Sequence, residues 1–220
     1  QSKFINNTAY YNGAVYMNGI GGTVDNCLFA DNRATDSAGA IGWVKKEKGT
    51  ISNSKFINNN APYGGAVYVN EGNNFTIMNS EFIKNNATTG GAVYWIGGDG
   101  FITDSSFDMN SAENDGGAVY FNGSNGVIMD SNFTNNRAFY NGAVYMNSIE
   151  GTVLGCLFAD NVATDSAGAL GWVKKENGTI YSSKFINNSA PRGGAIYLNN
   201  GTNFIISLSK FENNTASLNG

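Results

Sequence analysis

The sequence predicts an all-β fold, a right-handed single-stranded parallel β-helix (a solenoid) of about eight to nine coils. Each coil is expected to hold 25–27 residues and three short strands. Two observations lead to this prediction: one motif recurs along the whole chain, and the segments between its turns alternate apolar and polar residues. We therefore treat residues 1–220 as one solenoid segment, and we expect it to be a fragment of a longer repeat protein.

The composition favours a folded repeat protein with many turns. The 220 residues include 29 Gly, and charged residues make up 14% of the chain, well below the usual quarter. Hydrophobic residues nevertheless make up 41%, more than a disordered chain carries. The net charge of −4 argues against nucleic acid as a partner, because such a partner requires a basic surface. No apolar stretch approaches the about 18 residues that span a membrane, so we expect this segment not to cross one.

A phenylalanine marks each repeat. The Phe residues recur at intervals of 25 to 27 residues, and each is followed three residues later by Asn and five residues later by Ala. Ser or Cys lies two residues before each Phe, and Val or Ile lies five residues before every Phe after the first. This regularity predicts columns of like residues in stacked coils. The column comprises Phe4, Phe29, Phe56, Phe82, Phe107, Phe133, Phe158, Phe185 and Phe211.

The segments between the turns are typical of strands. A leucine-rich repeat has a similar period, but Leu is scarce here and no segment shows apolar residues at i, i+3, i+4 and i+7. Gly and Asn interrupt every candidate helix, and both are poor helix formers. The remaining short runs are β-branched and aromatic, which favours strands. We therefore predict coils that stack at about 4.8 Å.

The Phe column is expected to lie inside the tube, and the Asn column is expected to lie at its turns. Stacked Phe rings would contribute roughly 2–3 kcal/mol each through burial. The Asn three residues after each Phe is expected to begin a turn with positive φ and to pass amide hydrogen bonds from coil to coil. The Ser or Cys two residues before each Phe is expected to point inward with it.

The strand after each Gly-Ala pair has an outer face that we take as the candidate binding surface. An aliphatic residue follows Gly-Ala and an apolar residue follows two positions later, as in Val67 and Val69. Because side chains of a strand alternate between its faces, the residue between them points outward. Aromatic side chains are typical of binding surfaces, although Tyr also suits any exposed strand. The row comprises Tyr16, Tyr68, Tyr94, Tyr120, Tyr145 and Tyr197, with Gly at the equivalent positions Gly42 and Gly171.

A five-coil block is duplicated within the chain. Residues 11–70 closely match residues 140–199. Cys27 and Cys156 occupy equivalent positions in the two copies, in a column otherwise filled by Ser. Five coils separate them by about 24 Å, whereas a disulfide requires Cα atoms within about 7 Å. We therefore predict two buried cysteines that do not form a disulfide with each other.

The sequence predicts no metal, cofactor or catalytic site. Asp31 and Asp36 recur as Asp160 and Asp165, as copied repeat residues do, whereas a catalytic site on a β-helix normally interrupts the repeat once. The Lys-Lys-Glu sequence at 45–47, which recurs at 174–176, predicts a protruding charged loop.

The repeat motif resembles that of two groups of surface proteins. An F-x-x-N motif is paired with G-G-A-[VI], as in residues 56–59 with 64–67 and residues 185–188 with 193–196. Similar pairs cover essentially the whole chain, which resembles the polymorphic outer membrane proteins of chlamydiae and the Asn/Thr-rich adhesin-like proteins of methanogenic archaea. The resemblance implies a β-helix displayed at the cell surface and used in adhesion. Its partners would be a host or neighbouring-cell surface protein or glycan, or copies of itself, and no catalytic residues are carried over.

Three functions stay open at this point. The leading one is a non-catalytic, adhesin-like or stalk-forming extracellular module. The second is a polysaccharide lyase or glycoside hydrolase, against which stand the absence of His, the few Arg and the lack of a unique acidic cluster. The third is a self-assembling extracellular fibre subunit, since solenoids usually need caps and neither terminus resembles one.

Overall fold

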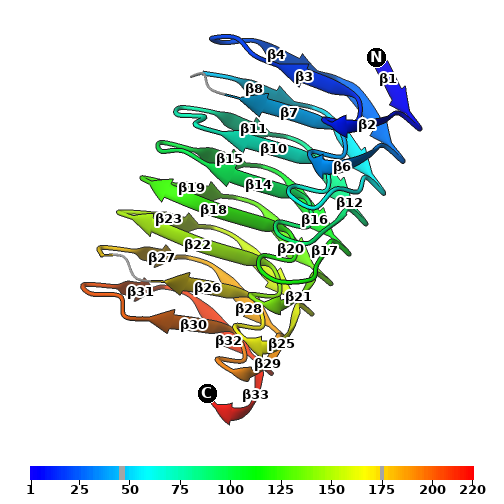
Figure 1. The fold of residues 1–220 in the computed structure, drawn as a ribbon. Helices are drawn as coiled ribbons and strands as arrows, with labels where there is room; N and C mark the ends of the chain where they lie inside the picture. The colour runs from blue at the N-terminus through cyan, green and yellow to red at the C-terminus, as the bar shows by residue number, and fades with distance from the viewer. Residues whose placement is uncertain (45–47, 174–175) are drawn as a thin grey trace.

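The protein is a tube of stacked coils. The computed structural model describes residues 1–44, 48–173 and 176–220, so the first predicted Lys-Lys-Glu loop (45–47) and two residues of the second (174–175) lie outside the described residues. The described chain is built from strands, which pair in parallel between successive coils, and the two termini lie at opposite ends of the stack (Figure 1). These ranges contain no helix with the length and apolar character needed to cross a membrane. The predicted all-β solenoid is confirmed.

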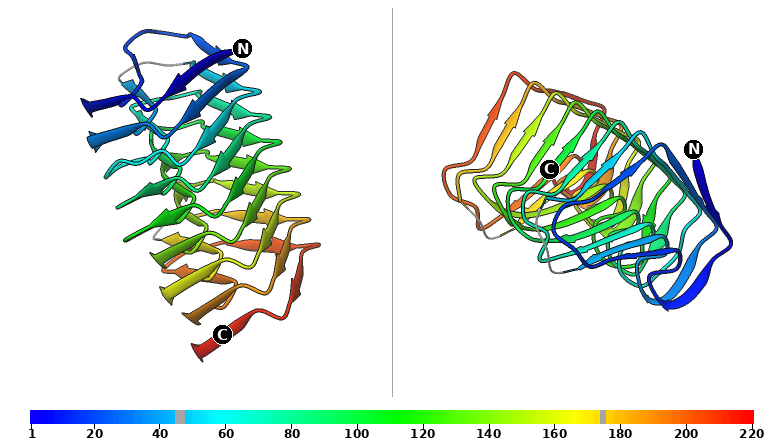
Figure 2. Two further views of the ribbon diagram at one scale, coloured as in Figure 1. Left: turned by 90° about the vertical axis from the view of Figure 1, so that its right-hand side faces the viewer. Right: turned by 90° about the horizontal axis from the view of Figure 1, so that it is seen from above.

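The strands form sheets that run along the tube and enclose its interior, as the view down the stack shows (Figure 2). The Phe sheet has nine strands, each carrying one residue of the Phe column. Like residues stand in register, so Phe82 pairs with both Phe56 and Phe107. The strands of the Phe sheet are β1 (Ser2–Ile5), β5 (Cys27–Ala30), β9 (Lys55–Ile57), β12 (Glu81–Ile83), β16 (Ser106–Asp108), β20 (Asn132–Thr134), β24 (Leu157–Ala159), β28 (Lys184–Ile186) and β32 (Lys210–Glu212).

Two eight-stranded sheets supply the remaining large apolar columns of the core. The Ile sheet carries the Val or Ile that lies five residues before each Phe, and the Tyr sheet carries the strand after each Gly-Ala pair. The strands of the Ile sheet are β4 (Thr23–Asp25), β8 (Thr50–Ser52), β11 (Thr76–Met78), β15 (Phe101–Thr103), β19 (Val127–Met129), β23 (Thr152–Leu154), β27 (Thr179–Tyr181) and β31 (Ile205–Ser207). The strands of the Tyr sheet are β3 (Val15–Met17), β7 (Ile41–Val44), β10 (Val67–Asn70), β14 (Val93–Ile96), β18 (Val119–Ser124), β22 (Val144–Ile149), β26 (Leu170–Val173) and β30 (Ile196–Asn199).

A fourth strand in all but one coil corrects the prediction of three strands per coil. It holds the Ala that lies five residues after each Phe, a segment that the sequence indicated as a turn. Because like residues stack in register, even two-residue segments find partners in the neighbouring coils, as Asn86 and Ala87 do. In one coil the segment is reduced to isolated bridges at Asn60. These strands are β2 (Thr8–Tyr11), β6 (Arg33–Ser37), β13 (Asn86–Ala87), β17 (Ser111–Ala112), β21 (Arg137–Tyr140), β25 (Val162–Ser166), β29 (Ser189–Arg192) and β33 (Thr215–Asn219).

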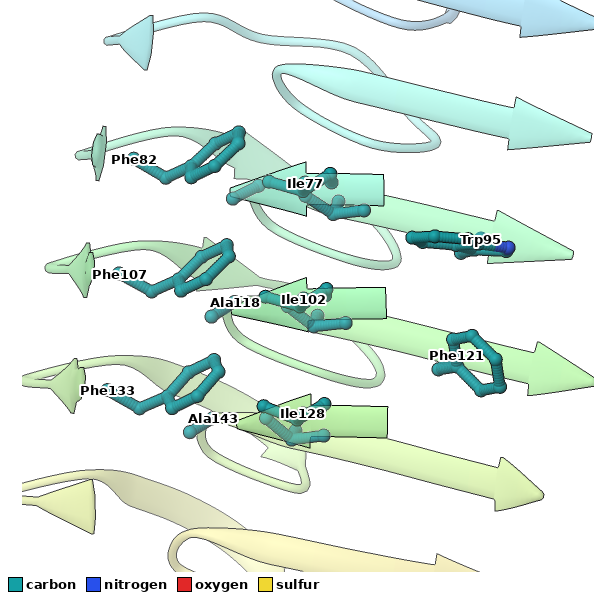
Figure 3. Close-up of a cluster of buried hydrophobic side chains, with 14 of the residues drawn as sticks. Ile77, Phe82, Trp95, Ile102, Phe107, Ala118, Phe121, Ile128, Phe133 and Ala143 are labelled. Atoms are coloured by element: carbon teal, nitrogen blue, oxygen red, sulfur yellow. The ribbon is translucent and has the colours of Figure 1, made fainter. Parts of the chain in front are cut away.

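The interior is filled by repeated columns of apolar side chains. Figure 3 shows the rings of Phe82, Phe107 and Phe133 in successive coils, beside a column of Ile. Along the whole Phe column, neighbouring ring centroids lie 4.6–4.9 Å apart. The Phe residues from Phe29 to Phe185 are fully buried, whereas Phe211 in the last coil is 44% exposed. The predicted inward Phe column is therefore confirmed.

A second group of aromatic side chains compensates for differences in the size of the inward residues from coil to coil. The residue seven positions before each Phe after the first is usually Gly, and a Cβ at Gly100 would lie 2.5 Å from the ring of Trp95. In the coil where Val69 replaces the large inward residue, Phe75 replaces that Gly and is fully buried. Phe75 contacts Trp95 edge-on, with ring centroids 5.3 Å apart. The exchange keeps the interior filled without a void, which a close-packed core requires.

The Asn column forms the predicted hydrogen-bonded ladder. Asn85 Oδ1 accepts hydrogen bonds from both the backbone N–H and the side-chain amide of Asn59, each at 3.0 Å. Asn85 Nδ2 donates to the Phe56 carbonyl oxygen at 3.0 Å. The prediction of positive φ at these Asn residues is wrong, because the residue before each one takes that conformation, as in Asn58 with a φ of 52°. The residue with positive φ therefore forms the turn at the surface, and the Asn that follows it points into the tube.

The two cysteines are free, as predicted. Cys156 is 2% exposed, and burial raises its pKa to about 12. Cys27 lies in the second coil and is only partly buried. The Ser residues of the same column point inward, as predicted. Ser54, for example, donates its hydroxyl proton to the Ser52 carbonyl oxygen at 2.7 Å.

Candidate functional site

The Tyr row lies on the outer face of the Tyr sheet, as predicted. Val67 and Val69 of β10 are fully buried, so Tyr68 between them projects away from the core and is half-buried. The same alternation holds in β14, where Tyr94 lies between two buried residues. Tyr16, in the first of these strands, is 55% exposed. The strands therefore bring the six predicted Tyr residues onto one surface.

Four consecutive Tyr rings of this row form a continuous stack. The centroid separations are 5.4 Å from Tyr68 to Tyr94, 4.8 Å from Tyr94 to Tyr120, and 4.5 Å from Tyr120 to Tyr145. The planes of neighbouring rings lie within 5° of parallel. Tyr63, which the sequence analysis did not select, contacts Tyr94 edge-on at 5.3 Å. The result is a flat aromatic strip, which Tyr63 widens beside Tyr94.

The hydroxyl groups of this strip stay protonated at neutral pH. Burial raises the pKa of both Tyr94 and Tyr120 to about 12. Burial also raises the pKa of the Asp115 carboxyl group, although a hydrogen bond from Asn141 Nδ2 at 2.9 Å acts in the opposite direction. Burial, and after it the charge of Asp115, raises the pKa of Tyr145. The strip therefore offers apolar ring surface together with neutral hydroxyls that both donate and accept hydrogen bonds.

Two glycines interrupt the row. Gly42 stands in register between Tyr16 and Tyr68, and Gly171 stands between Tyr145 and Tyr197. An Asn side chain from the preceding coil covers each glycine. A Cβ at Gly42 would lie 1.5 Å from Asn12 Oδ1, and one at Gly171 would lie 1.6 Å from Asn141 Oδ1. The two positions therefore exclude any side chain while that Asn is present.

A cavity lies at each interruption. The first encloses about 510 Å³ and the second about 190 Å³. Every residue that lines the first cavity has its duplicated counterpart in the lining of the second. The residues of the first are Tyr11, Asn12, Tyr16, Asp36, Ser37, Val44, Tyr68 and Asn70. Those of the second are Tyr140, Asn141, Tyr145, Asp165, Ser166, Val173, Tyr197 and Asn199, with Asp115 and Arg192 in addition.

The copied acidic residues divide into two groups. Asp31 and Asp160 accept hydrogen bonds from Asn side chains of the next coil, the first at 2.6 Å from Asn58. Asp36 and Asp165 line the two cavities, and Asp165 forms an ion pair with Arg192. Within the described part of the chain, His, Cys, Asp and Glu form no group of three or more that could hold a metal ion.

The sequence of residues 65–219 matches the family model described as the right handed beta helix region. This match covers well over half of the chain. The chain belongs to the right-handed β-helix family. No curated protein matches the sequence of this β-helix. Among solved structures, that of the Streptococcus pneumoniae surface protein and adhesin PfbA is similar at 10% identity with a TM-score of 0.35, and the alignment covers 99% of this chain and 84% of that one.

Proposed function

We propose that this β-helix is a non-catalytic, adhesin-like binding module of a protein displayed at the cell surface, and that the Tyr row is its contact surface. The observation that carries the proposal is the stack from Tyr68 to Tyr145, four parallel rings held on a rigid sheet and open to solvent on one side. The similarity of the repeat motif to adhesin-like surface proteins supports the extracellular location.

The physical properties of the strip suit recognition of a surface glycan or protein. Tyr side chains provide large amphipathic contact area and lose little conformational entropy on binding. Stacking on both sides already restricts Tyr94 and Tyr120, so binding them costs even less entropy. Aromatic residues are also enriched where proteins contact partners. A neighbouring copy of this chain is a further partner that such a strip would accept.

A non-catalytic role is part of the proposal. The copied residues Asp31 and Asp160 are engaged in hydrogen bonds of the turns, and Asp165 is engaged by Arg192. Incubation with uronate-containing and neutral polysaccharides tests this part directly. We expect no new reducing ends or unsaturated products, and measurable product release would contradict it.

The contact surface is tested by removing the centre of the strip. The double variant Tyr94→Ser with Tyr120→Ser should lose binding to a panel of immobilised extracellular glycoproteins. The matched control is Tyr181→Ser, which removes a 41% exposed Tyr from the outer face of another sheet. Binding that survives the double variant, or that Tyr181→Ser removes equally, would refute the assignment. Sedimentation of both proteins against concentration shows whether the strip instead joins copies of the chain.

A further inference from the structure

The residue at one corner of each coil correlates with the residue of the Tyr row in the next coil. This corner residue precedes the Gly-Ala pair and has positive φ in every coil. Where it is Gly or Ala, the next coil carries Tyr, as in Ala38 with Tyr68 and Gly64 with Tyr94. Where it is Asn, the next coil carries Gly, and the only such pairs are Asn12 with Gly42 and Asn141 with Gly171. The interruptions of the row are therefore paired substitutions, with the Asn amide lying where a Tyr would begin.

The interruption at Gly42 leaves a slot of suitable width for one ring. Neighbouring Tyr rings of the row stand 4.5–5.4 Å apart, so one missing ring separates Tyr16 from Tyr68 by two coils, about 9.6 Å. A flat ring placed midway would lie about 4.8 Å from each Tyr, the stacking distance of the row itself. The floor of the slot is the backbone of Gly42 and the amide of Asn12.

The edges of the slot are polar. Asp36 and Ser37 lie along one edge together with Tyr11, and Asn70 lies on the other. In the described part of the chain Asp36 forms no ion pair. A carboxylate in a half-buried position requires hydrogen-bond donors from its ligand, because leaving it without them costs free energy. The occupant must therefore present two apolar faces and an edge of donors.

The copy at Gly171 has the counterparts of the first lining, with Asp115 and Arg192 in addition, and an ion pair narrows it. Position 63 of the first copy corresponds to position 192 of the second, and Tyr63 is there replaced by Arg192. Arg192 donates two hydrogen bonds to the carboxylate of Asp165, the counterpart of Asp36. Tyr63 instead contacts Tyr94 edge-on and does not line the slot. This exchange and the presence of Asp115 in the second lining accompany the difference between cavities of about 510 and 190 Å³.

We propose that the slot at Gly42 binds one pyranose ring of a neutral glycan, and that the slot at Gly171 is a closed copy of it. A pyranose has two faces of C–H groups for Tyr16 and Tyr68 and hydroxyl donors for Asp36. A Phe side chain would fill the width but leave the carboxylate without donors, and a Tyr or Trp side chain would supply only one donor. The carboxylate of Asp36 would repel a uronate. This inference rests on the proposed function and narrows it to a ligand class and a site of one ligand per chain.

Exchanging the residues at positions 63 and 192 between the two copies tests the proposal. Arrays of neutral and uronate oligosaccharides identify the probe, and titration calorimetry with the neutral oligosaccharide of highest signal gives affinity and stoichiometry. Tyr63→Arg should close the first slot and weaken binding at least about tenfold. Arg192→Tyr should open the second slot and raise the stoichiometry from one to two. A merely structural effect of these substitutions cannot produce the second result.

A variant that fills the slot provides the control for folding. Asn12→Gly with Gly42→Tyr recreates the pair found at Gly64 and Tyr94, so it should fold with an unchanged melting temperature and lose the neutral oligosaccharide. The same pair of changes at Asn141 and Gly171 should leave affinity and stoichiometry unchanged. If Asn12→Gly with Gly42→Tyr still binds the neutral oligosaccharide, the proposed binding in the slot is wrong. If Tyr94→Ser with Tyr120→Ser then abolishes that binding, the proposed function survives without the slot. An array on which no neutral oligosaccharide binds also overturns the slot, whereas binding to the glycoprotein panel decides the proposed function separately.

Discussion

The Phe column and the Tyr row are both stacks of aromatic rings one coil apart, yet only the Phe column is continuous through every coil. Phe107 and its neighbours are fully buried in a closed tube, where a missing ring would leave a cavity. The Tyr rings are open to solvent on one side, and at Gly42 the Asn12 amide occupies only the position where a Tyr side chain would begin. The comparison shows that this solenoid maintains its fold with the interior columns, so variation on the outer row is available for binding.

The largest expected effect is the loss of an interior ring. Phe107→Ala should reduce the free energy of unfolding by about 3–5 kcal/mol, because the neighbouring rings of Phe82 and Phe133 cannot close the cavity. Tyr120→Ala, the matched change on the outer row, should cost about 1–2 kcal/mol. Urea unfolding of both variants measures the difference. Equal losses of unfolding free energy in the two variants would show that the Phe column stabilises the fold no more than the Tyr row does.

The Asn ladder should be the next most sensitive interior feature. Asn110→Ala removes the oxygen that accepts hydrogen bonds from the backbone N–H and the side-chain amide of Asn85. Each buried group left without a partner costs about 1–3 kcal/mol. The matched outer change is Asn60→Ala, which removes an exposed hydrogen bond from Asn60 Nδ2 to the Asn86 carbonyl oxygen and should have little effect. A comparable loss of unfolding free energy in both variants would show that the ladder does not stabilise the tube.

The Tyr row should also make the stability of the protein depend on pH, with a smaller effect than the interior substitutions. The pKa of Tyr94 and Tyr120 is raised from 10.0 to about 12, so the folded state keeps these protons after the unfolded state has lost them. Their contribution to stability is therefore fully present below pH 10 and is lost as the pH rises from 10 toward 12. Urea midpoints measured across this range should fall less steeply for Tyr94→Phe with Tyr120→Phe than for the unaltered protein. Identical slopes would mean that the hydroxyls are not desolvated by the stack.

The smallest effect should come from the cysteines. Cys156→Ser restores the residue used in most coils of its column, so stability should change by less than about 1 kcal/mol. In the native protein a thiol reagent should modify Cys27 first, because Cys156 is buried and its pKa is raised to about 12. Labelling followed by peptide mass spectrometry measures the order. Rapid modification of Cys156 would indicate that the core opens locally.

Residues that repeat in every coil could be placed from the sequence. The inward direction of Phe56, the outward direction of Tyr68 and the separation of Cys27 from Cys156 follow from the period and from strand alternation. Stacked identical coils leave no freedom in such positions, because each residue must lie above its equivalent. The edge contact of Tyr63 was missed, since it joins two different columns across a corner.

The sequence by itself determined the parallel β-helix, its interior columns and the existence of an outer Tyr row, because these depend only on spacing along the chain. The tertiary structure decided which residues meet between columns. It placed Asn12 over Gly42, paired Arg192 with Asp165, filled the core beside Val69 with Phe75, and gave all but one coil a fourth strand. The physical reason is that these contacts depend on how far a side chain reaches across a turn into the next coil, a distance that the period of the repeat does not contain.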